Sequence, residues 1–154
     1  MNVFFADEQM DPVDSSDLVP LADLVMRAEG LPEESEVAIV FIDRDEIAAY
    51  NEQYLGKAGP TDVLSFPIED GSPGEPPRRD PEGPPVNIGD VFIAPSVVRD
   101  NAARSAVAFE DELALMVVHG LLHLLGWDHE DDDEAVRMEA RERELLGSVG
   151  KVRP

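Results

Sequence analysis

The only three histidines of this chain, His119, His123 and His129, lie within one eleven-residue stretch, HGLLHLLGWDH. The first two are four positions apart, so on a helix they share one face, one turn from each other. Gly126 follows them, and glycine readily adopts the left-handed conformation that ends a helix and turns the chain. Such a turn returns His129 toward the first pair. Three converging imidazoles are a known ligand set of a catalytic zinc ion whose fourth position holds water.

The ligand chemistry favours zinc as the cofactor, because imidazole suits this ion and a three-histidine site leaves one position open. Nickel, copper and iron are also compatible with three imidazoles. Histidines on an apolar helix often have a purely structural role, but that role does not explain why all three gather in one place. A ligating histidine usually donates its second ring N–H to a carboxylate or carbonyl group, and Asp128 is a candidate for this role. The acids from Glu130 to Glu134 are typical of a solvated helix start.

Position 120 distinguishes the motif from that of the H-E-x-x-H metalloproteases, in which the residue after the first histidine is the general base. Here that residue is Gly120, which has no side chain. The chain therefore has the ligand spacing of the protease class without its base. A bound metal still lowers the pKa of its water toward about 7. A phosphodiester is the more suitable substrate, because the charge of the metal stabilises pentacovalent oxyanions directly.

Several elements are needed to position this motif. Runs of β-branched and apolar residues predict strands at 2–5, 37–42, 61–66 and 87–94, and the strand at 37–42 is expected to be buried on both faces. Helical spacing and capping residues predict helices that begin at Ser15 or Ser16, at Asp43 or Asp45, at Pro95, near 110 and near 131.

The helix that carries the first two histidines is apolar almost all round, so we expect it at the centre of the protein. The order of elements predicts an α+β fold, a small mixed β-sheet packed with helices in a zincin-like arrangement. We expect residues 1–154 to form a single domain, with a proline-rich surface loop at about 69–86.

Composition narrows the function further. The formal net charge is −22, which argues against a broad electrostatic surface for nucleic acid and against DNA as a partner. No apolar run is long enough to span a membrane, and the N-terminus lacks the pattern of a signal peptide. The absence of cysteine excludes thiolate ligands and is consistent with a cytoplasmic protein.

Three blocks of this sequence resemble the YbeY family of bacterial ribosome-maturation endoribonucleases. HGLLHLLGWDH is similar to the family signature H-G-x-L-H-L-x-G-[YW]-D-H, and PTDVLSFP, from Pro60 to Pro67, is similar to its second hallmark. IGDVFIA, from Ile88 to Ala94, resembles a further strand of the family. Together with the order of elements, the resemblance covers the chain from about Val37 to Leu146.

The resemblance implies a single-strand-specific, metal-dependent endoribonuclease. Such proteins process ribosomal RNA, including the 3′ end of the small-subunit RNA, and act in ribosome quality control. The implied partners are single-stranded ribosomal RNA and the ribosome or its proteins. The implied metal ligands are His119, His123 and His129. A metal-bound water is the expected catalytic group, with Lys57 and Asp128 as further candidates for a catalytic role. Attack by water and attack by a ribose hydroxyl are both open.

The chain departs from the family pattern near its second block. Many members have an arginine directly after a tyrosine a few residues before this block, whereas here Leu55 follows Tyr54. Lys57 is a candidate for the missing cation, although an ordinary loop lysine explains it slightly better. Lysine is a point charge on a flexible stem, so it would hold a phosphate less rigidly than arginine. Arg78 and Arg79 in the proline-rich loop are either RNA contacts or solvated side chains.

Two other classes of function compete with this interpretation. The first is a metal-dependent peptidase or amidase, against which Gly120 argues. The second is a non-enzymatic ribosome-assembly factor with a structural metal, which would normally have a fourth protein ligand, such as Asp128. The strongly acidic composition adds the hypothesis that a partner, such as a ribosomal protein, helps this protein to reach RNA.

Overall fold

The computed structural model describes residues 1–154. Its four strands are β1 (Asn2–Glu8), β2 (Ser35–Ile42), β3 (Val63–Pro67) and β4 (Val86–Ile93). Its five helices are α1 (Leu18–Ala28), α2 (Arg44–Leu55), α3 (Pro95–Arg104), α4 (Phe109–Leu124) and α5 (Asp132–Gly147). All four expected strands and all five expected helices are present, so the α+β fold is confirmed.

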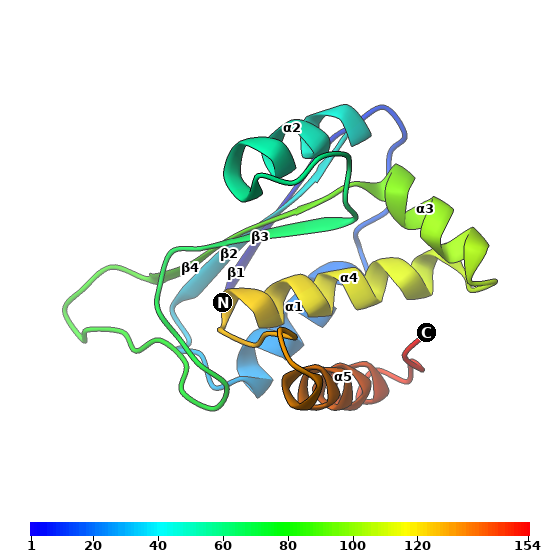
Figure 1. Ribbon diagram of the computed structural model, residues 1–154. Coiled ribbons are helices and arrows are strands. Elements are labelled where there is room, and N and C mark those ends of the chain that lie inside the picture. The colour runs from blue at the N-terminus through cyan, green and yellow to red at the C-terminus, as the bar shows by residue number, and fades with distance from the viewer.

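The strands form one mixed sheet in the order β1-β2-β4-β3 (Figure 1). β1, β2 and β4 run parallel to one another, and β3 pairs antiparallel with β4 at the edge. The long segment between β3 and β4 contains the proline-rich residues, and one end of it is closed by a bridge between Ser72 and Glu75. The edge strand β3 and its neighbour β4 both lie directly against α4.

The helices cover the two faces of the sheet unequally. α1, α4 and α5 lie on one face, and α2 lies on the other (Figure 1). The larger apolar cluster joins α4 to the sheet through fully buried side chains such as Val118, Leu121, Ile39 and Val91. The smaller cluster, Ile42, Ile47, Leu64 and Ala94, packs α2 against the opposite face. The histidine helix is therefore held between the sheet and two other helices.

Two local predictions are wrong. The N-cap of α1 is Asp17 and not Ser15 or Ser16; a turn in which the carbonyl of Ser15 accepts the backbone N–H of Leu18 at 3.0 Å precedes the helix. β2 is not equally buried on both faces. From Ser35 to Val40 its side chains alternate between buried and half-buried, since the single helix α2 covers only part of the outer face, whereas Phe41 and Ile42 at its end are both buried.

α4 is buried for most of its length, as its composition predicted. Ten of its sixteen residues are buried, and its first turn carries Glu110, Asp111 and Glu112. Acidic side chains at this end interact favourably with the helix dipole. No helix of the structure is both long enough and apolar enough to cross a membrane.

Candidate metal centre

The three histidines converge as their spacing predicted. One ring nitrogen from each of His119, His123 and His129 lies within 4.8 Å of those from the other two, and together they form a group that can hold a metal ion. The ring centroids of His119 and His123 are 4.4 Å apart. The centroid of His129 lies 5.5 Å from that of His119 and 5.0 Å from that of His123. The pair is partly buried, whereas His129 is exposed. The site is therefore anchored in the core and open on one side.

The turn after α4 brings His129 back to the other two histidines. α4 ends at Leu124, and the N–H of Trp127 returns to the carbonyl of Leu122 at 3.0 Å. Gly126 has a φ of +92°, a conformation that side chains disfavour. A Cβ atom at this position would lie only 2.2 Å from the carbonyl oxygen of Gly71. The start of the proline-rich segment thus packs directly against the turn, which the sequence did not reveal.

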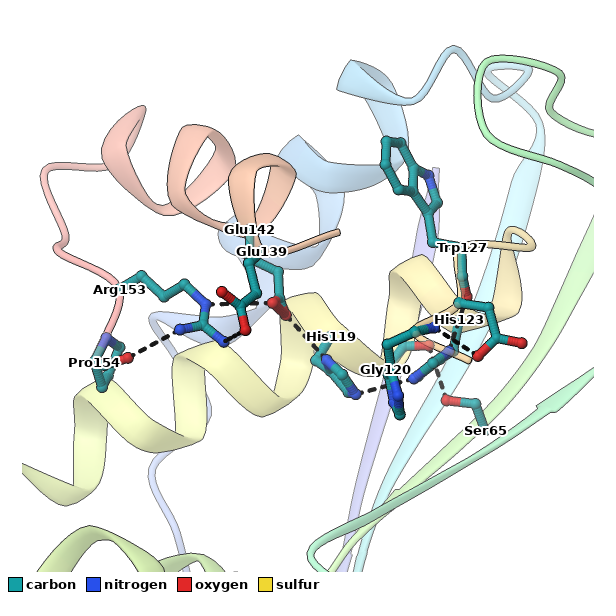
Figure 2. Close-up of polar contacts among 11 residues, drawn as sticks. Ser65, His119, Gly120, His123, Trp127, Glu139, Glu142, Arg153 and Pro154 are labelled. Atoms are coloured by element: carbon teal, nitrogen blue, oxygen red, sulfur yellow. Dashed lines mark hydrogen bonds and ion pairs between the residues drawn. The ribbon is translucent and has the colours of Figure 1, made fainter. Parts of the chain in front are cut away.

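Each histidine of the α4 pair has its Nδ1 atom engaged by a protein acceptor (Figure 2). Nδ1 of His119 donates to Oε2 of Glu142 at 3.0 Å, and Nδ1 of His123 donates to the backbone carbonyl of Trp127 at 2.8 Å. A carbonyl oxygen only accepts, so it places the proton of neutral His123 on Nδ1. The carboxylate favours the same tautomer for His119. Both rings therefore present an Nε2 lone pair on the opposite side.

These two lone pairs face each other. The Nε2 atoms of His119 and His123 are 2.9 Å apart. Two acceptors at this distance repel unless a proton or a cation lies between or beside them. Imidazole nitrogens with outer hydrogen bonds of this kind are the usual ligands of zinc and similar ions. The residues present thus fit a transition-metal ion.

The environment of His123 keeps its ring in the form that binds metals. Burial lowers the pKa of His123, and the neighbouring His119 lowers it further. A lowered pKa means that the imidazole is neutral at physiological pH, with its Nε2 lone pair free.

Glu142, the carboxylate partner of His119, is not among the residues predicted from the sequence. It is 1% exposed and lies on α5, 23 positions after His119. A signal for it was present, because Glu142 falls in the apolar stripe of Met138, Leu145 and Leu146, where a solvated glutamate has no place. A carboxylate buried in such a stripe must be paired with another polar group. Its partner is a candidate metal ligand.

A second buried acid supports the turn that carries His129. Glu29, which follows α1, accepts the indole N–H of Trp127 at 2.6 Å through Oε1. Its other oxygen accepts two N–H groups of Arg141, at 2.7 and 2.9 Å. Trp127 also supplies the carbonyl that orients His123, so Glu29 and Arg141 hold the backbone of the site in place.

The face of α4 that carries Gly120 packs against the sheet. A Cβ atom at Gly120 would lie 2.6 Å from Cγ1 of Val91 and 3.2 Å from Cγ2 of Val63. The hydroxyl of Ser65 donates to the carbonyl of Gly120 at 2.9 Å and fixes the helix to β3 (Figure 2). The base of the H-E-x-x-H proteases is therefore absent, and this fold also has no room for it.

Substituting Gly120 by alanine is expected to destabilise the protein by about 1–2 kcal/mol. Overpacking against the buried Val91 costs about 1–3 kcal/mol, and the better helix propensity of alanine recovers up to about 1 kcal/mol of it. Chemical denaturation measures the difference. Gly147→Ala is the matched control, because its Cβ would meet nothing within 4 Å in the last turn of α5. Equal stability of the two variants would contradict the packing described for Gly120.

The remaining predicted residues lie outside the group of three histidines. Asp128 is not among the grouped ligands; its Oδ1 accepts the backbone N–H of His129 at 2.8 Å. Lys57 is exposed in the loop after α2, and its side chain makes no hydrogen bond or ion pair. Leu55 is the last residue of α2 and is 52% exposed. The catalytic roles suggested for Lys57 and Asp128 stay predictions.

The two arginines of the proline-rich loop differ in their surroundings. Arg79 pairs with Glu34 at 3.1 Å and donates to the carbonyl of Gly83 at 2.7 Å, so it holds the loop to the protein. Arg78 is exposed and makes no ion pair.

The fold and the site together define a class of protein. It is an α+β protein in which a buried helix, and the glycine turn that follows it, gather three histidines on one face of a four-stranded sheet. A family model described as Endoribonuclease YbeY matches residues 5–150. The chain belongs to the YbeY family.

Named relatives agree with this assignment. An Endoribonuclease YbeY of Acidothermus cellulolyticus is 38% identical over 95% of this chain and 90% of its own length. That of Geobacillus thermodenitrificans is 37% identical over 99% of both chains. A solution structure of a Thermotoga maritima protein has 25% identity and a TM-score of 0.59, with coverage of 95% of this chain and 90% of that one.

Proposed function

We propose that this protein is a metal-dependent endoribonuclease that cleaves single-stranded RNA in the processing of ribosomal RNA, including the 3′ end of the small-subunit RNA, and in ribosome quality control. The endoribonuclease activity follows from family membership, because relatives named Endoribonuclease YbeY match this chain over nearly its full length. The substrate, the ribosome as partner and a cytoplasmic location are what this family membership implies.

The observation that carries the metal dependence is the pair of facing Nε2 atoms, 2.9 Å apart, whose rings are held by outer hydrogen bonds. We propose that His119, His123 and His129 hold one zinc ion. A bound zinc ion would act as a Lewis acid for water and for the phosphate. Around it, Glu142 and the Trp127 carbonyl fix the two α4 rings, and the Asp128 carboxylate fixes the backbone of His129.

Two structural observations count against the competing functions. A peptidase of the H-E-x-x-H type needs a carboxylate after its first histidine ligand, and Val91 fills the space beside Gly120. A structural zinc site normally has four protein ligands, whereas the donor group here consists of three histidines and includes no carboxylate. The first observation disfavours the peptidase, and the second favours a catalytic metal site over a structural one.

The acidic surface leaves few basic groups for RNA. Arg141, Arg143 and Arg153, near the histidines in sequence, all form ion pairs with acids. The basic side chains without an ion pair are Lys57, Arg78, Arg104 and Arg137. Non-specific affinity for RNA scales with the number of phosphates neutralised, so it should be weak. We propose that a partner such as a ribosomal protein brings the RNA. Strong, salt-sensitive binding of naked RNA would contradict this proposal.

Replacing Leu55 by arginine is expected to strengthen RNA binding by about three- to tenfold at low salt. The added guanidinium can neutralise one more phosphate and release roughly one more counterion. Leu55 is exposed at the end of α2, so the change should not disturb the core. Fluorescence anisotropy with a single-stranded RNA, at two salt concentrations, measures the effect. Leu55→Met is the matched control. A gain with both variants would show that charge is not the cause.

The proposed function is tested by comparing substrates on one preparation. A single-stranded RNA oligomer, its duplex, a DNA oligomer of the same sequence and casein are each incubated with the protein, before and after chelation and after zinc is returned. We expect internal cleavage of the single-stranded RNA alone, lost on chelation and restored by zinc. Cleavage of casein alone would favour the peptidase. No cleavage of any substrate by the zinc-loaded protein would favour the assembly factor.

A further inference from the structure

Glu142 divides its two carboxylate oxygens between the candidate metal centre and the C-terminal segment (Figure 2). Oε2 accepts Nδ1–H of His119 at 3.0 Å, and Oε1 accepts Nε–H of Arg153 at 3.3 Å. Arg153 lies six residues beyond the end of α5, and its side chain is only 21% exposed. The buried carboxylate of Glu142 thus links the candidate ligand His119 to Arg153, which the histidine motif does not predict.

Glu142 needs a partner of this kind. Its side chain is 1% exposed, and both oxygens of a carboxylate removed from water need hydrogen-bond partners. Nδ1–H of His119 occupies one oxygen. The guanidinium of Arg153 occupies the other. Glu139, on the same side of α5, lies 3.9 Å from the same guanidinium and is half-exposed, so its contact is the weaker one.

We propose that Arg153 is a positioning residue of the metal centre, which acts on His119 through Glu142. The proposal rests on the function proposed above, in that it assumes a metal on the three histidines. Arg153 fixes the orientation of the Glu142 carboxylate. The oriented carboxylate accepts Nδ1–H of His119, and this leaves the Nε2 lone pair directed at the metal position. The C-terminal segment is therefore energetically coupled to metal binding.

Replacing Arg153 by methionine tests this coupling, because methionine keeps much of the apolar stem and removes the guanidinium. We expect the zinc affinity, measured by competition with a chelating dye, to fall about tenfold, the lower end of the loss typical of outer-shell partners. Arg153→Lys should lose less, since it keeps the charge without the fork of N–H donors. With cobalt in place of zinc, the visible absorption of Arg153→Met should also change, because His119 is reoriented.

Lys151 provides the matched control. It belongs to the same C-terminal segment and pairs with Asp111 at 3.5 Å, but it does not touch Glu142. Lys151→Met should therefore loosen the segment without changing zinc affinity or the cobalt spectrum. An equal loss of affinity in both variants would show that docking of the segment matters, and not the contact with Glu142. That result would overturn the proposal.

A double-mutant cycle completes the test. If Arg153 acts through Glu142, Arg153→Met should cause no further loss of zinc affinity in a Glu142→Gln background. An undiminished tenfold loss in that background, or wild-type affinity in the single Arg153→Met variant, would overturn the proposal. Denaturation of the zinc-free proteins shows whether each variant is folded. If the wild-type protein binds no zinc, the proposed function itself fails. If the wild-type protein binds zinc but Arg153→Met leaves the affinity unchanged, only the role of Arg153 fails.

Discussion

Replacing His123 by alanine is expected to abolish tight zinc binding and RNA cleavage together. His123 offers one of three ring nitrogens that lie within 4.8 Å of one another. If the free energy of zinc binding is shared roughly equally among its ligands, the loss of one lowers affinity by about 10²–10³-fold. The Lewis acid contributes several kcal/mol to the stabilisation of the transition state, so cleavage should fall by about 10³-fold or more.

The measurement uses zinc content and single-turnover cleavage of a single-stranded RNA on the same samples. His123→Gln is the second variant, because its amide can still donate to the Trp127 carbonyl, to which His123 now donates at 2.8 Å. It should remain folded and yet bind zinc weakly, which separates ligation from packing. Cleavage that persists at the wild-type rate in a zinc-free variant would reveal a contaminating nuclease and contradict the mechanism.

Replacing Gly126 by alanine is expected to cause the largest loss of stability, about 2–5 kcal/mol. The left-handed conformation costs a side chain about 1–2 kcal/mol, and the clash with the Gly71 carbonyl adds about 1–3 kcal/mol. For a protein of this size the melting temperature should fall by roughly 5–15 °C. Zinc affinity should fall as well, because relief of the clash moves the turn that carries His129.

Gly56 provides the control for this prediction. It ends α2 with a φ of +66°, and a Cβ atom there would meet nothing within 4 Å. Gly56→Ala should therefore lose only the stability that the left-handed conformation costs a side chain, and its zinc affinity should be unchanged. Thermal melting and dye competition on both variants separate backbone strain from the clash. If Gly126→Ala melts no lower than Gly56→Ala, the contact between the turn and the proline-rich segment is not important for stability.

The helices and strands of this fold can be predicted from local sequence patterns. The β-branched run at 37–42 identified β2, and the apolar stretch after Glu112 identified α4 as the buried helix. The spacing of His119 and His123 fixed their shared face, and Gly126 marked the turn that brings His129 back. These features depend on residues close together in the sequence, for which helical periodicity and glycine conformation are sufficient guides.

The contacts that hold the site in place cannot be predicted in the same way, because they join residues that are far apart in the sequence. The sequence suggests Asp128 as the carboxylate partner of a histidine, whereas the carboxylate beside His119 belongs to Glu142 on α5. The packing of Gly71 against Gly126 and the contact of Glu29 with Trp127 also depend on tertiary structure. Only the position of Glu142 within an apolar stripe gave a sign that it is paired.

The most direct test of the central claim is a zinc titration of the metal-free protein, with cleavage of a single-stranded RNA recorded at each step. Activity should be absent at the start, rise linearly and reach its maximum at one zinc ion per chain, whereas His123→Ala should stay inactive throughout. Full activity of the metal-free protein, or saturation of the three histidines with zinc without any cleavage of RNA, would contradict the proposed metal dependence.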